Sequence, residues 1–288
     1  MSRPPAMPWW LAGLHLLVLW SFAVAQPLFD LLGKNGEFFA ARGSTRWDAV
    51  LFALVVTFVP PAVLLGIELL VPRHVRFAVH SVFVAGLVGL FVLQAIRGVG
   101  GPGLLLVAFA AAVGLGAAEL YLRVGGARTA LTVLAPAPLL FLGLFLFNSD
   151  VSRLSLSAES ASAAAERPRA PVVLVVFDEL PINSLLDAKG KIDATRFPNF
   201  ARLERGSTWY EHTSTVAEGT THAVPAILTG RYPRAGEFPV YTDHRQNLFT
   251  LLGGATRLHV VDEETHLCPP SLCTGIDGSF GGRTKTLA

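Results

Sequence analysis

Two acidic residues and a pair of hydroxyls are the groups of this sequence best suited to chemistry. Asp178 and Glu179 close the apolar run PVVLVVFDEL, and Thr220 and Thr221 follow a glycine in EGTTHAVPAIL. Carboxylate oxygens are preferred ligands of hard divalent cations, and a hydroxyl beside such a cation can be deprotonated and act as a nucleophile. Considered separately, two adjacent acids that close a strand are more often helix-capping or solvated groups, and a threonine in this position is more often a helix N-cap.

The elements around these residues are expected to place them at one edge of a sheet. The apolar run before Asp178 does not alternate, which predicts a strand buried on both faces in a parallel sheet. Its acids then lie at the carboxyl end of a strand, where open α/β sheets bind ligands. Thr220 precedes an apolar helical stretch, whose first N–H groups and dipole favour an anion.

The rest of the polar half predicts alternating helices and strands. Residues 196–207 and 246–254 predict short helices that end at glycines, and residues 208–215 and 257–264 predict strands. Strands and helices in this order are typical of a doubly wound α/β domain.

The two cysteines, Cys268 and Cys273, lie close together in CPPSLC. In an oxidising compartment this spacing predicts a small disulfide loop, and the alternatives are two unpaired thiols or half of a metal site.

The composition indicates a membrane protein. The 288 residues have a mean hydropathy of +0.50, and only 15% of them are charged, which is too apolar for a soluble protein of this length. Of the 44 charged residues, 14 lie in positions 1–148 and 30 in positions 149–288. The net charge is +2 and the basic residues are scattered, so nucleic acid is not an expected partner.

Five apolar stretches are long enough to cross a bilayer, which requires about 20 residues in a helix. The sequence therefore predicts an α-helical transmembrane anchor over residues 1–148, a Ser/Ala-rich linker over 149–171, and a catalytic region over 172–288. The predicted spans lie near residues 9–25, 49–71, 77–96, 103–122 and 129–147.

The charges between the spans give a weak preference for a cytoplasmic N-terminus. The competing interpretation treats the first stretch as a signal peptide that is cleaved after Ala23-Val24-Ala25, which leaves four spans. Both interpretations place the residues after 148 on the extracytoplasmic side of the cell membrane.

Four ionisable residues fall within or near the spans and are candidates for function, as such groups are costly in a bilayer. Glu68 and Glu119 lie within about one turn of the proposed interface and can reach water by snorkelling, and His15 and His80 are expected to be packed neutral groups.

Together, the motifs of the polar half resemble the alkaline phosphatase superfamily in its sulfatase-like branch. VVLVVFDEL is similar to the first strand and acidic metal site, FPNFARL to the T-P-N-L-x-x-L segment, STWYEHTST to the strand that follows, and LTGRYP to the L-T-G-R-Y-P signature. The resemblance covers residues 172–262. It implies a partial α/β sulfatase-like domain, with Asp178, Glu179 and Thr220 as ligands of a divalent metal ion such as Zn, Mn, Mg or Ca.

The resemblance also implies a nucleophile. In the family it lies ten residues before the glycine of L-T-G, and in the related phosphoethanolamine transferases a nucleophilic threonine lies five residues before a proline. Counting back from Gly230 and from Pro225 leads to Thr220 both times, and Thr221 is the alternative if the alignment contains a one-residue gap. True sulfatases carry C-x-P-x-R here, which this chain lacks. His222, in the same loop, is a weaker candidate for contact with substrate.

The implied function is that of a membrane-anchored phosphotransferase similar to phosphoethanolamine transferases and lipoteichoic acid synthases, which also have five transmembrane helices. The partners implied are membrane lipid, a phospholipid donor, and a glycan or lipid acceptor. The alternatives are a sulfatase-like ester hydrolase and a non-catalytic membrane remnant or scaffold.

A complete domain of this family is considerably longer than the region after the linker. We therefore expect this chain to be a fragment or truncated product without the later metal ligands. Asp243-His244 come too soon after LTGRYP to be the late Asp-His pair of the family.

Overall fold

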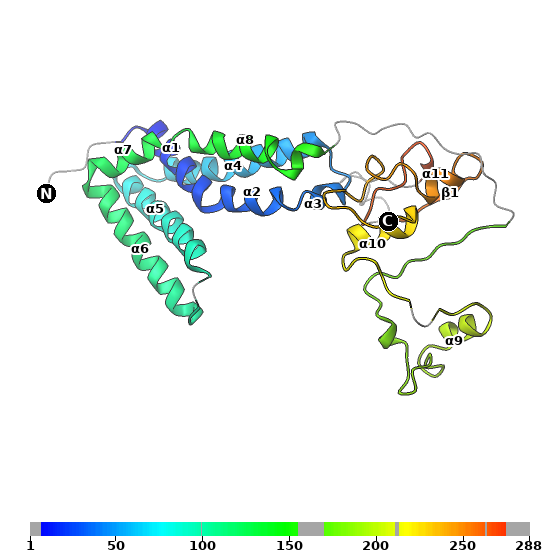
Figure 1. Ribbon diagram of the computed structural model, residues 1–288. Helices are drawn as coiled ribbons and strands as arrows, with labels where there is room; N and C mark the ends of the chain where they lie inside the picture. The colour runs from blue at the N-terminus through cyan, green and yellow to red at the C-terminus, as the bar shows by residue number, and fades with distance from the viewer. Residues whose placement is uncertain (1–6, 99, 155–169, 211–212, 263, 275–288) are drawn as a thin grey trace. The chain divides into compact units, whose positions relative to one another are not determined.

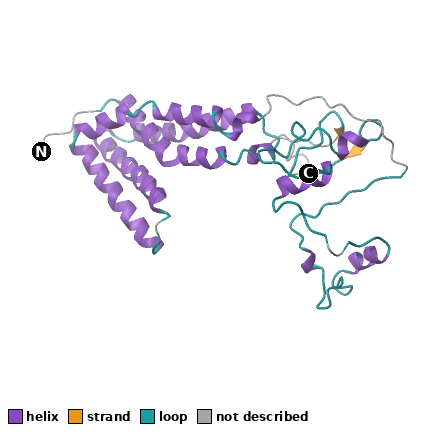
Figure 2. Cartoon of the chain, in the orientation of Figure 1, coloured by secondary structure: helices purple, strands orange, loops and turns teal. Residues whose placement is uncertain are grey.

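The computed structural model describes residues 7–98, 100–154, 170–210, 213–262 and 264–274. The chain divides into two compact units, residues 1–157 and residues 158–288. The described part of the first unit is mostly helical, whereas loops make up most of the second (Figures 1 and 2). Each unit is described by itself below.

The first unit contains five helical stretches that are long and apolar enough to cross a membrane. The chain is thus a membrane protein by the length and composition of its helices. The stretches are Trp9–Gly33, Arg46–Leu70, Arg73–Ile96, Gly103–Arg123 and Gly125–Phe147. The helices of this unit are α1 (Trp9–Trp20), α2 (Gln26–Gly33), α3 (Glu37–Ala40), α4 (Arg46–Leu70), α5 (Arg73–Ile96), α6 (Gly103–Arg123), α7 (Gly125–Val133) and α8 (Ala137–Phe147).

Local sequence signals start the long helices. Thr45 and Asp48 form a capping box at the start of α4, in which each side chain bonds to the backbone N–H of the other. Pro72 and Pro102 stand directly before α5 and α6, where a missing N–H leaves no helical hydrogen bond unmade.

The first stretch extends farther than the sequence indicates, because the helix continues to Gly33 rather than ending near Ala25. α1 and α2 are joined by a π-helical turn, Ser21–Ala25, and the Gln94 side-chain amide donates a hydrogen bond of 2.6 Å to the Ala23 carbonyl. Ala23 and Ala25 are buried in this turn. The stretch therefore packs as part of the bundle, with the Ala-Val-Ala sequence inside a continuous helix.

The fifth stretch is broken at its prolines, as their missing N–H groups predict. α7 ends at Val133 and α8 starts at Ala137, with Pro136 and Pro138 at the break. Hydrogen bonds to the carbonyl three residues earlier replace the lost α-helical ones. Ala135 N–H donates to the Thr132 carbonyl, and Ala137 N–H donates to the Leu134 carbonyl. The break thus retains backbone hydrogen bonds, which membrane helices require.

α5 and α6 run side by side (Figure 1), with glycines at their closest approach. A Cβ atom placed on Gly114 would lie 2.2 Å from the Ala85 carbonyl oxygen and 3.0 Å from the Gly89 nitrogen. Small residues let membrane helices approach backbone to backbone. Gly114 is therefore required by the packing of this pair.

The segment after α8 belongs to the first unit rather than to a linker. A 3-10 turn, Asp150–Arg153, follows α8, and Val151 and Leu154 are both buried. The predicted start of the linker at residue 149 is therefore too early by at least six residues, and residues 155–169 of the predicted linker lie outside the described ones.

The second unit has short elements joined by loops. These are a 3-10 turn at Ile182–Ser184, α9 (Pro198–Arg205), α10 (Thr220–Thr229), α11 (Leu248–Leu252), β1 (Leu258–His259) and β2 (Cys273–Thr274). β1 and β2 pair in parallel, Leu258 with Cys273, and they are the two strands within the described part of this unit (Figure 2). The predicted helices at 196–207 and 246–254 are present as α9 and α11.

The buried strand predicted before Asp178 is not formed. Residues 172–177 have no strand pairing within the described residues, and their side chains are exposed, with Val173 at 84%. The described residues of 208–215 likewise form no strand, and residues 211 and 212 lie outside the description. A strand buried on both faces requires partner strands and covering helices, and the described elements supply neither to residues 172–177. The doubly wound sheet is therefore not seen.

Candidate active site

The helix α10 carries the predicted nucleophile as its first residue. α10 starts at Thr220 after Gly219 and ends at Thr229, followed by Gly230 with φ of 66°, in the left-handed region that favours glycine. The Gly219 position has no side chain that caps the helix. The hydroxyl of Thr220 thus stands at a helix N-terminus, where partial positive charge favours an anion.

Thr220 and Asp178 are brought together from positions 42 residues apart. The Thr220 hydroxyl donates a hydrogen bond of 2.9 Å to Asp178 Oδ1. A base within about 2.6–3.2 Å of a hydroxyl is in reach of its proton. The two side chains therefore form a hydroxyl–carboxylate pair of the kind that activates a nucleophile.

Glu179, the other predicted acid, does not join this pair. Its side chain is exposed and forms no hydrogen bond to Asp178 or Thr220 within the described residues. Its backbone has φ of 52°, in the left-handed region, where a residue other than glycine is uncommon. The acid pair thus ends in a turn with a strained backbone conformation, a feature that recurs at functional sites.

The Asp178 and Thr220 oxygens fit a hard divalent cation by their spacing. Oxygens that occupy neighbouring positions around Mg²⁺, at about 2.0–2.1 Å from the ion, lie about 2.9 Å from each other. Asp178 Oδ1 and Thr220 Oγ1 are 2.9 Å apart. No group of three or more His, Cys, Asp or Glu side chains within the described residues is arranged to hold a metal ion. Because 2.9 Å is also the length of an ordinary hydrogen bond, metal binding by Asp178, Glu179 and Thr220 stays a prediction.

The alternative nucleophile, Thr221, has a different partner. Its hydroxyl lies 3.2 Å from Nδ1 of the neighbouring His222, and both residues line a cavity of about 440 Å³ beside α10. The structure thus separates the two threonines chemically, since Thr220 contacts a carboxylate and Thr221 contacts an imidazole.

The cavity beside α10 is rich in cationic side chains. It lies between α10 and the loop that follows, and Arg231 in this loop donates a hydrogen bond of 2.5 Å to the Gln246 side-chain carbonyl. Guanidinium groups bind phosphate and sulfate oxygens with well-defined geometry. The charged residues and histidines of its lining are His222, Arg231, Arg234, Glu237, Asp243, His244 and Arg245.

His244 is the residue of this cavity that sequence reasoning set aside. Burial lowers the pKa of His244 below its ordinary value, although the carboxylates of Glu237 and Asp243 act in the opposite direction. Asp243 itself accepts a hydrogen bond of 2.8 Å from the Phe238 N–H. The signal in the sequence was the density of charged residues between positions 231 and 245, which is high for a short loop.

A disulfide between Cys268 and Cys273 closes the loop that leads into β2. Both cysteines are buried, and Leu267 beside them is fully buried. The neighbouring Asn247 caps α11 through Thr250 and also donates a hydrogen bond of 2.9 Å to the Leu267 carbonyl. The disulfide loop and α11 therefore stabilise each other.

The ionisable residues of the spans have contrasting environments. Glu119 is exposed on α6 and forms an ion pair with Arg123 one turn later, as expected for a group near an interface. Glu68 is 3% exposed and pairs with the buried His80 on α5. The expectation that Glu68 reaches water by snorkelling is therefore wrong.

Comparisons of the chain with protein-family models, with curated proteins and with solved structures found no match.

Proposed function

We propose that this chain is part of a membrane-anchored, metal-dependent phosphotransferase of the sulfatase-like kind, with Thr220 as its nucleophile. The observation that carries the proposal is the hydrogen bond between the Thr220 hydroxyl and Asp178 across 42 residues of sequence. The LTGRYP segment, the acids after the apolar run and the five spans support the same proposal. The partial α/β domain and the position of this region outside the cell membrane are parts of the proposal.

The proposed reaction has two displacement steps at phosphorus. In the first, Thr220 Oγ1 forms a bond to phosphorus, and the bond from phosphorus to the lipid alcohol breaks. The hydroxyl proton passes to the Asp178 carboxylate, which is in hydrogen-bond contact with it, and then to the departing alkoxide. In the second, an acceptor hydroxyl or water oxygen forms a bond to phosphorus, the bond from phosphorus to Thr220 Oγ1 breaks, and the proton of the acceptor passes to the released Thr220 oxygen.

A divalent cation held by Asp178, Glu179 and Thr220 would lower the pKa of the hydroxyl and shield the charge of the transferring group. Zn, Mn, Mg and Ca ions are the candidates. The arginines of the cavity beside α10 would bind the oxygens of the phospho-substituent. The five spans would keep the site at the bilayer surface, where a phospholipid donor and a glycan or lipid acceptor are available.

Mass spectrometry of the full chain tests the nucleophile. The complete enzyme that contains this chain is incubated with a membrane lipid extract and each divalent ion in turn, and its peptides are then searched for a phospho-substituent on threonine. We expect an adduct on Thr220, its loss in Thr220→Ala, and its retention in Thr221→Ala, because the second threonine contacts His222 instead of Asp178.

A third variant, Asp178→Asn, separates the role of the carboxylate from that of the hydroxyl. The amide still accepts the hydrogen bond from Thr220 but cannot take its proton, so the adduct is expected to form at least tenfold more slowly. An adduct on Thr221, or an adduct rate that Asp178→Asn leaves unchanged, would contradict the proposed chemistry. Absence of any threonine adduct with every ion would favour a non-catalytic membrane scaffold.

A further inference from the structure

Each of the five candidate spans contributes one polar side chain to a continuous set of hydrogen bonds. We call this set the five-span network, and its members come from α1, α4, α5, α6 and α7 in turn. No buried side-chain nitrogen or oxygen among the described residues lacks a partner. The members are His15, Glu68, His80, Tyr121 and Thr132.

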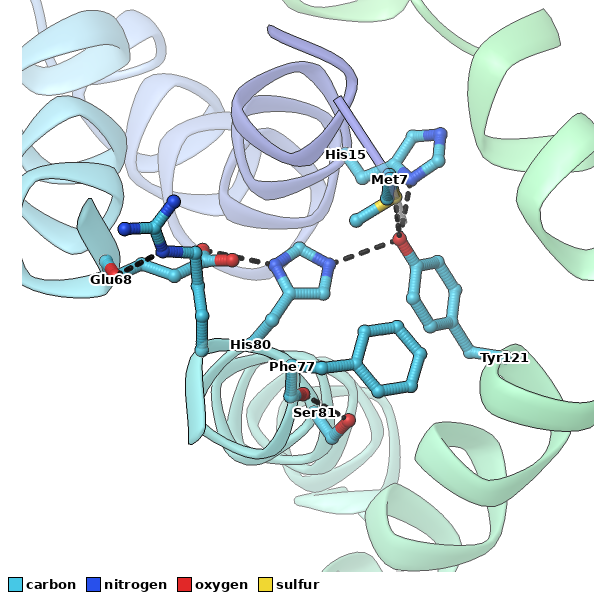
Figure 3. Close-up of polar contacts among 8 residues, drawn as sticks. Met7, His15, Glu68, Phe77, His80, Ser81 and Tyr121 are labelled. Carbon is cyan, nitrogen blue, oxygen red and sulfur yellow. Dashed lines mark hydrogen bonds and ion pairs between the residues drawn. The ribbon is translucent and has the colours of Figure 1, made fainter. Parts of the chain in front are cut away.

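The contacts follow one order from Glu68 to Thr132. His80 lies between Glu68 and Tyr121, with 3.1 Å from Nδ1 to the carboxylate and 3.0 Å from Nε2 to the hydroxyl (Figure 3). The Tyr121 hydroxyl is 2.6 Å from Nδ1 of His15, and Nε2 of His15 is 3.0 Å from Thr132 Oγ1. His15 and His80 are fully buried, and Tyr121 is 2% exposed.

All five residues lie at the same membrane face. Glu68 and Tyr121 are each two residues from the ends of their helices, whereas His15, His80 and Thr132 are within about two turns of the starts of theirs. Because successive spans run in opposite directions, these positions share one side of the bilayer, opposite to the end of α8. The network therefore does not provide a proton path through the membrane.

The direction of the hydrogen bonds can be deduced from the Thr132 end. The Thr132 hydroxyl donates to the Arg128 carbonyl at 3.0 Å, and a carbonyl only accepts. With its single hydrogen used there, Thr132 must accept from His15 Nε2–H. His15 Nδ1 then accepts from Tyr121, since a neutral imidazole carries one hydrogen.

The same logic fixes the other half of the network. Tyr121 has given its only hydrogen to His15, so the Tyr121 oxygen accepts from His80 Nε2–H. Five bonds, from Glu68 to the Arg128 carbonyl, therefore require five hydrogens. Two neutral histidines, one tyrosine and one threonine supply four. The fifth is an additional proton that lies between Glu68 and His80 Nδ1.

We propose that the five-span network is a binding site for one proton, shared by Glu68 and His80, and that this proton completes the attachment of the five spans to each other. With the proton bound, the Glu68–His80 pair has no net charge, whether the proton is nearer to the oxygen or to the nitrogen. This neutrality suits a buried membrane site, where an uncompensated charge is costly.

Loss of the proton has a specific structural consequence. The four remaining hydrogens satisfy the four contacts between helices only if the three bonds from His80 to Thr132 reverse. Thr132 then donates to His15, His15 to Tyr121, Tyr121 to His80, and His80 to Glu68. The bond from Thr132 to the Arg128 carbonyl is then lost, and a buried negative charge is left on Glu68. The two states differ at His15, which carries its hydrogen on Nε2 with the proton bound and on Nδ1 without it.

Other charged and polar groups around the network do not alter this hydrogen count. The Arg76 guanidinium on α5 donates to the backbone carbonyls of Glu68, Leu69 and Val71 at the end of α4. The charge of Arg128 on α7 acts on His15 and Tyr121. The Tyr121 hydroxyl can also donate to the Met7 sulfur at 3.2 Å, but sulfur is a weak acceptor, so the hydrogen goes to His15 Nδ1 at 2.6 Å.

Two measurements on the full chain in detergent test the proposal. Nitrogen NMR of the imidazoles at neutral pH is expected to show hydrogen on Nε2 of His15 and none on its Nδ1. Equilibrium unfolding as a function of pH is expected to show lower stability at alkaline than at neutral pH, approaching tenfold in the unfolding constant per pH unit. The sign follows because the folded network binds one proton more than the separated helices.

Glu68→Gln is the informative variant, because its amide supplies the fifth hydrogen without a proton. The difference in pH dependence between wild type and Glu68→Gln isolates the network, and we expect the tenfold change to disappear in the variant. Glu119→Gln is the matched control and should keep the dependence, since Glu119 is exposed and pairs with Arg123 one turn later, outside the network. Hydrogen on Nδ1 of His15 at neutral pH, or equal pH dependence in wild type and Glu68→Gln, would overturn the proposal.

Discussion

Replacement of Gly114 by alanine tests how closely α5 and α6 pack. The new Cβ would lie 2.2 Å from the Ala85 carbonyl oxygen, and ordinary contact begins at 3.4 Å, so the helix backbones must separate by more than 1 Å. The obstacle is backbone and cannot rotate away. Overpacking of this kind costs about 1–3 kcal/mol, whereas alanine gains about 1 kcal/mol over glycine in helix propensity. We expect Gly114→Ala to lower the free energy of unfolding by up to about 2 kcal/mol relative to wild type, and to be about 1–3 kcal/mol less stable than a glycine-to-alanine change without a clash.

Gly116→Ala on the same helix is the matched control, because nothing lies within 4 Å of its Cβ position. This control keeps the gain in helix propensity and has no clash, so it should be neutral or slightly stabilising. Both variants would be unfolded in mixed micelles with increasing SDS and followed by circular dichroism. Equal stability of the two variants would show that the helices are not in backbone contact at Gly114.

Two further predictions concern the second unit. Gly230→Ala should destabilise this unit by about 1 kcal/mol, because an L-residue in the left-handed region is unfavourable. Gly206→Ala is the control, since Gly206 at the end of α9 has φ of −102°, and it should have little effect. Thermal unfolding of both variants measures the difference. Burial lowers the pKa of His244, so below about pH 6.5 the folded unit binds fewer protons than the unfolded chain. Acidification should therefore destabilise the folded unit. His244→Gln should weaken this pH dependence, which unfolding measured over a series of pH values would show.

The sequence predicted helices wherever the signal was local. Apolar length alone located the five spans, and proline and glycine located α9 and α11, because each of these effects acts within a few residues of chain. The end of the first span was misplaced since nothing in the composition near Ala25 distinguishes a π-helical turn from a helix end. Gln94, whose amide satisfies that turn, is 71 residues away.

Strands were predicted less well, because pairing depends on distant partners. The run at 172–177 has the composition of a buried strand but no partner within the described residues, whereas β1 formed where Cys273 came alongside Leu258. Composition reports what a segment prefers when covered and carries no information about what covers it.

The candidate site shows the same division. Resemblance of motifs selected Thr220 and Asp178, which the structure brings within 2.9 Å, although their roles in catalysis stay a prediction. The five-span network could not be predicted as a unit, since its members are single residues in five apolar segments. Glu68 and His80 were noted individually, but only the turn at Pro72 makes them neighbours.

The five-span network also imposes an order on biogenesis. Spans emerge from the ribosome one after another, and the α4–α5 hairpin joins Glu68 to His80 before Tyr121 has been synthesised. Until α6 arrives, Nε2 of His80 and one ring nitrogen of His15 lack their final partner within the bilayer. An incomplete bundle thus leaves unmatched polar atoms in lipid, where such atoms are costly, and the arrival of α6 removes this cost.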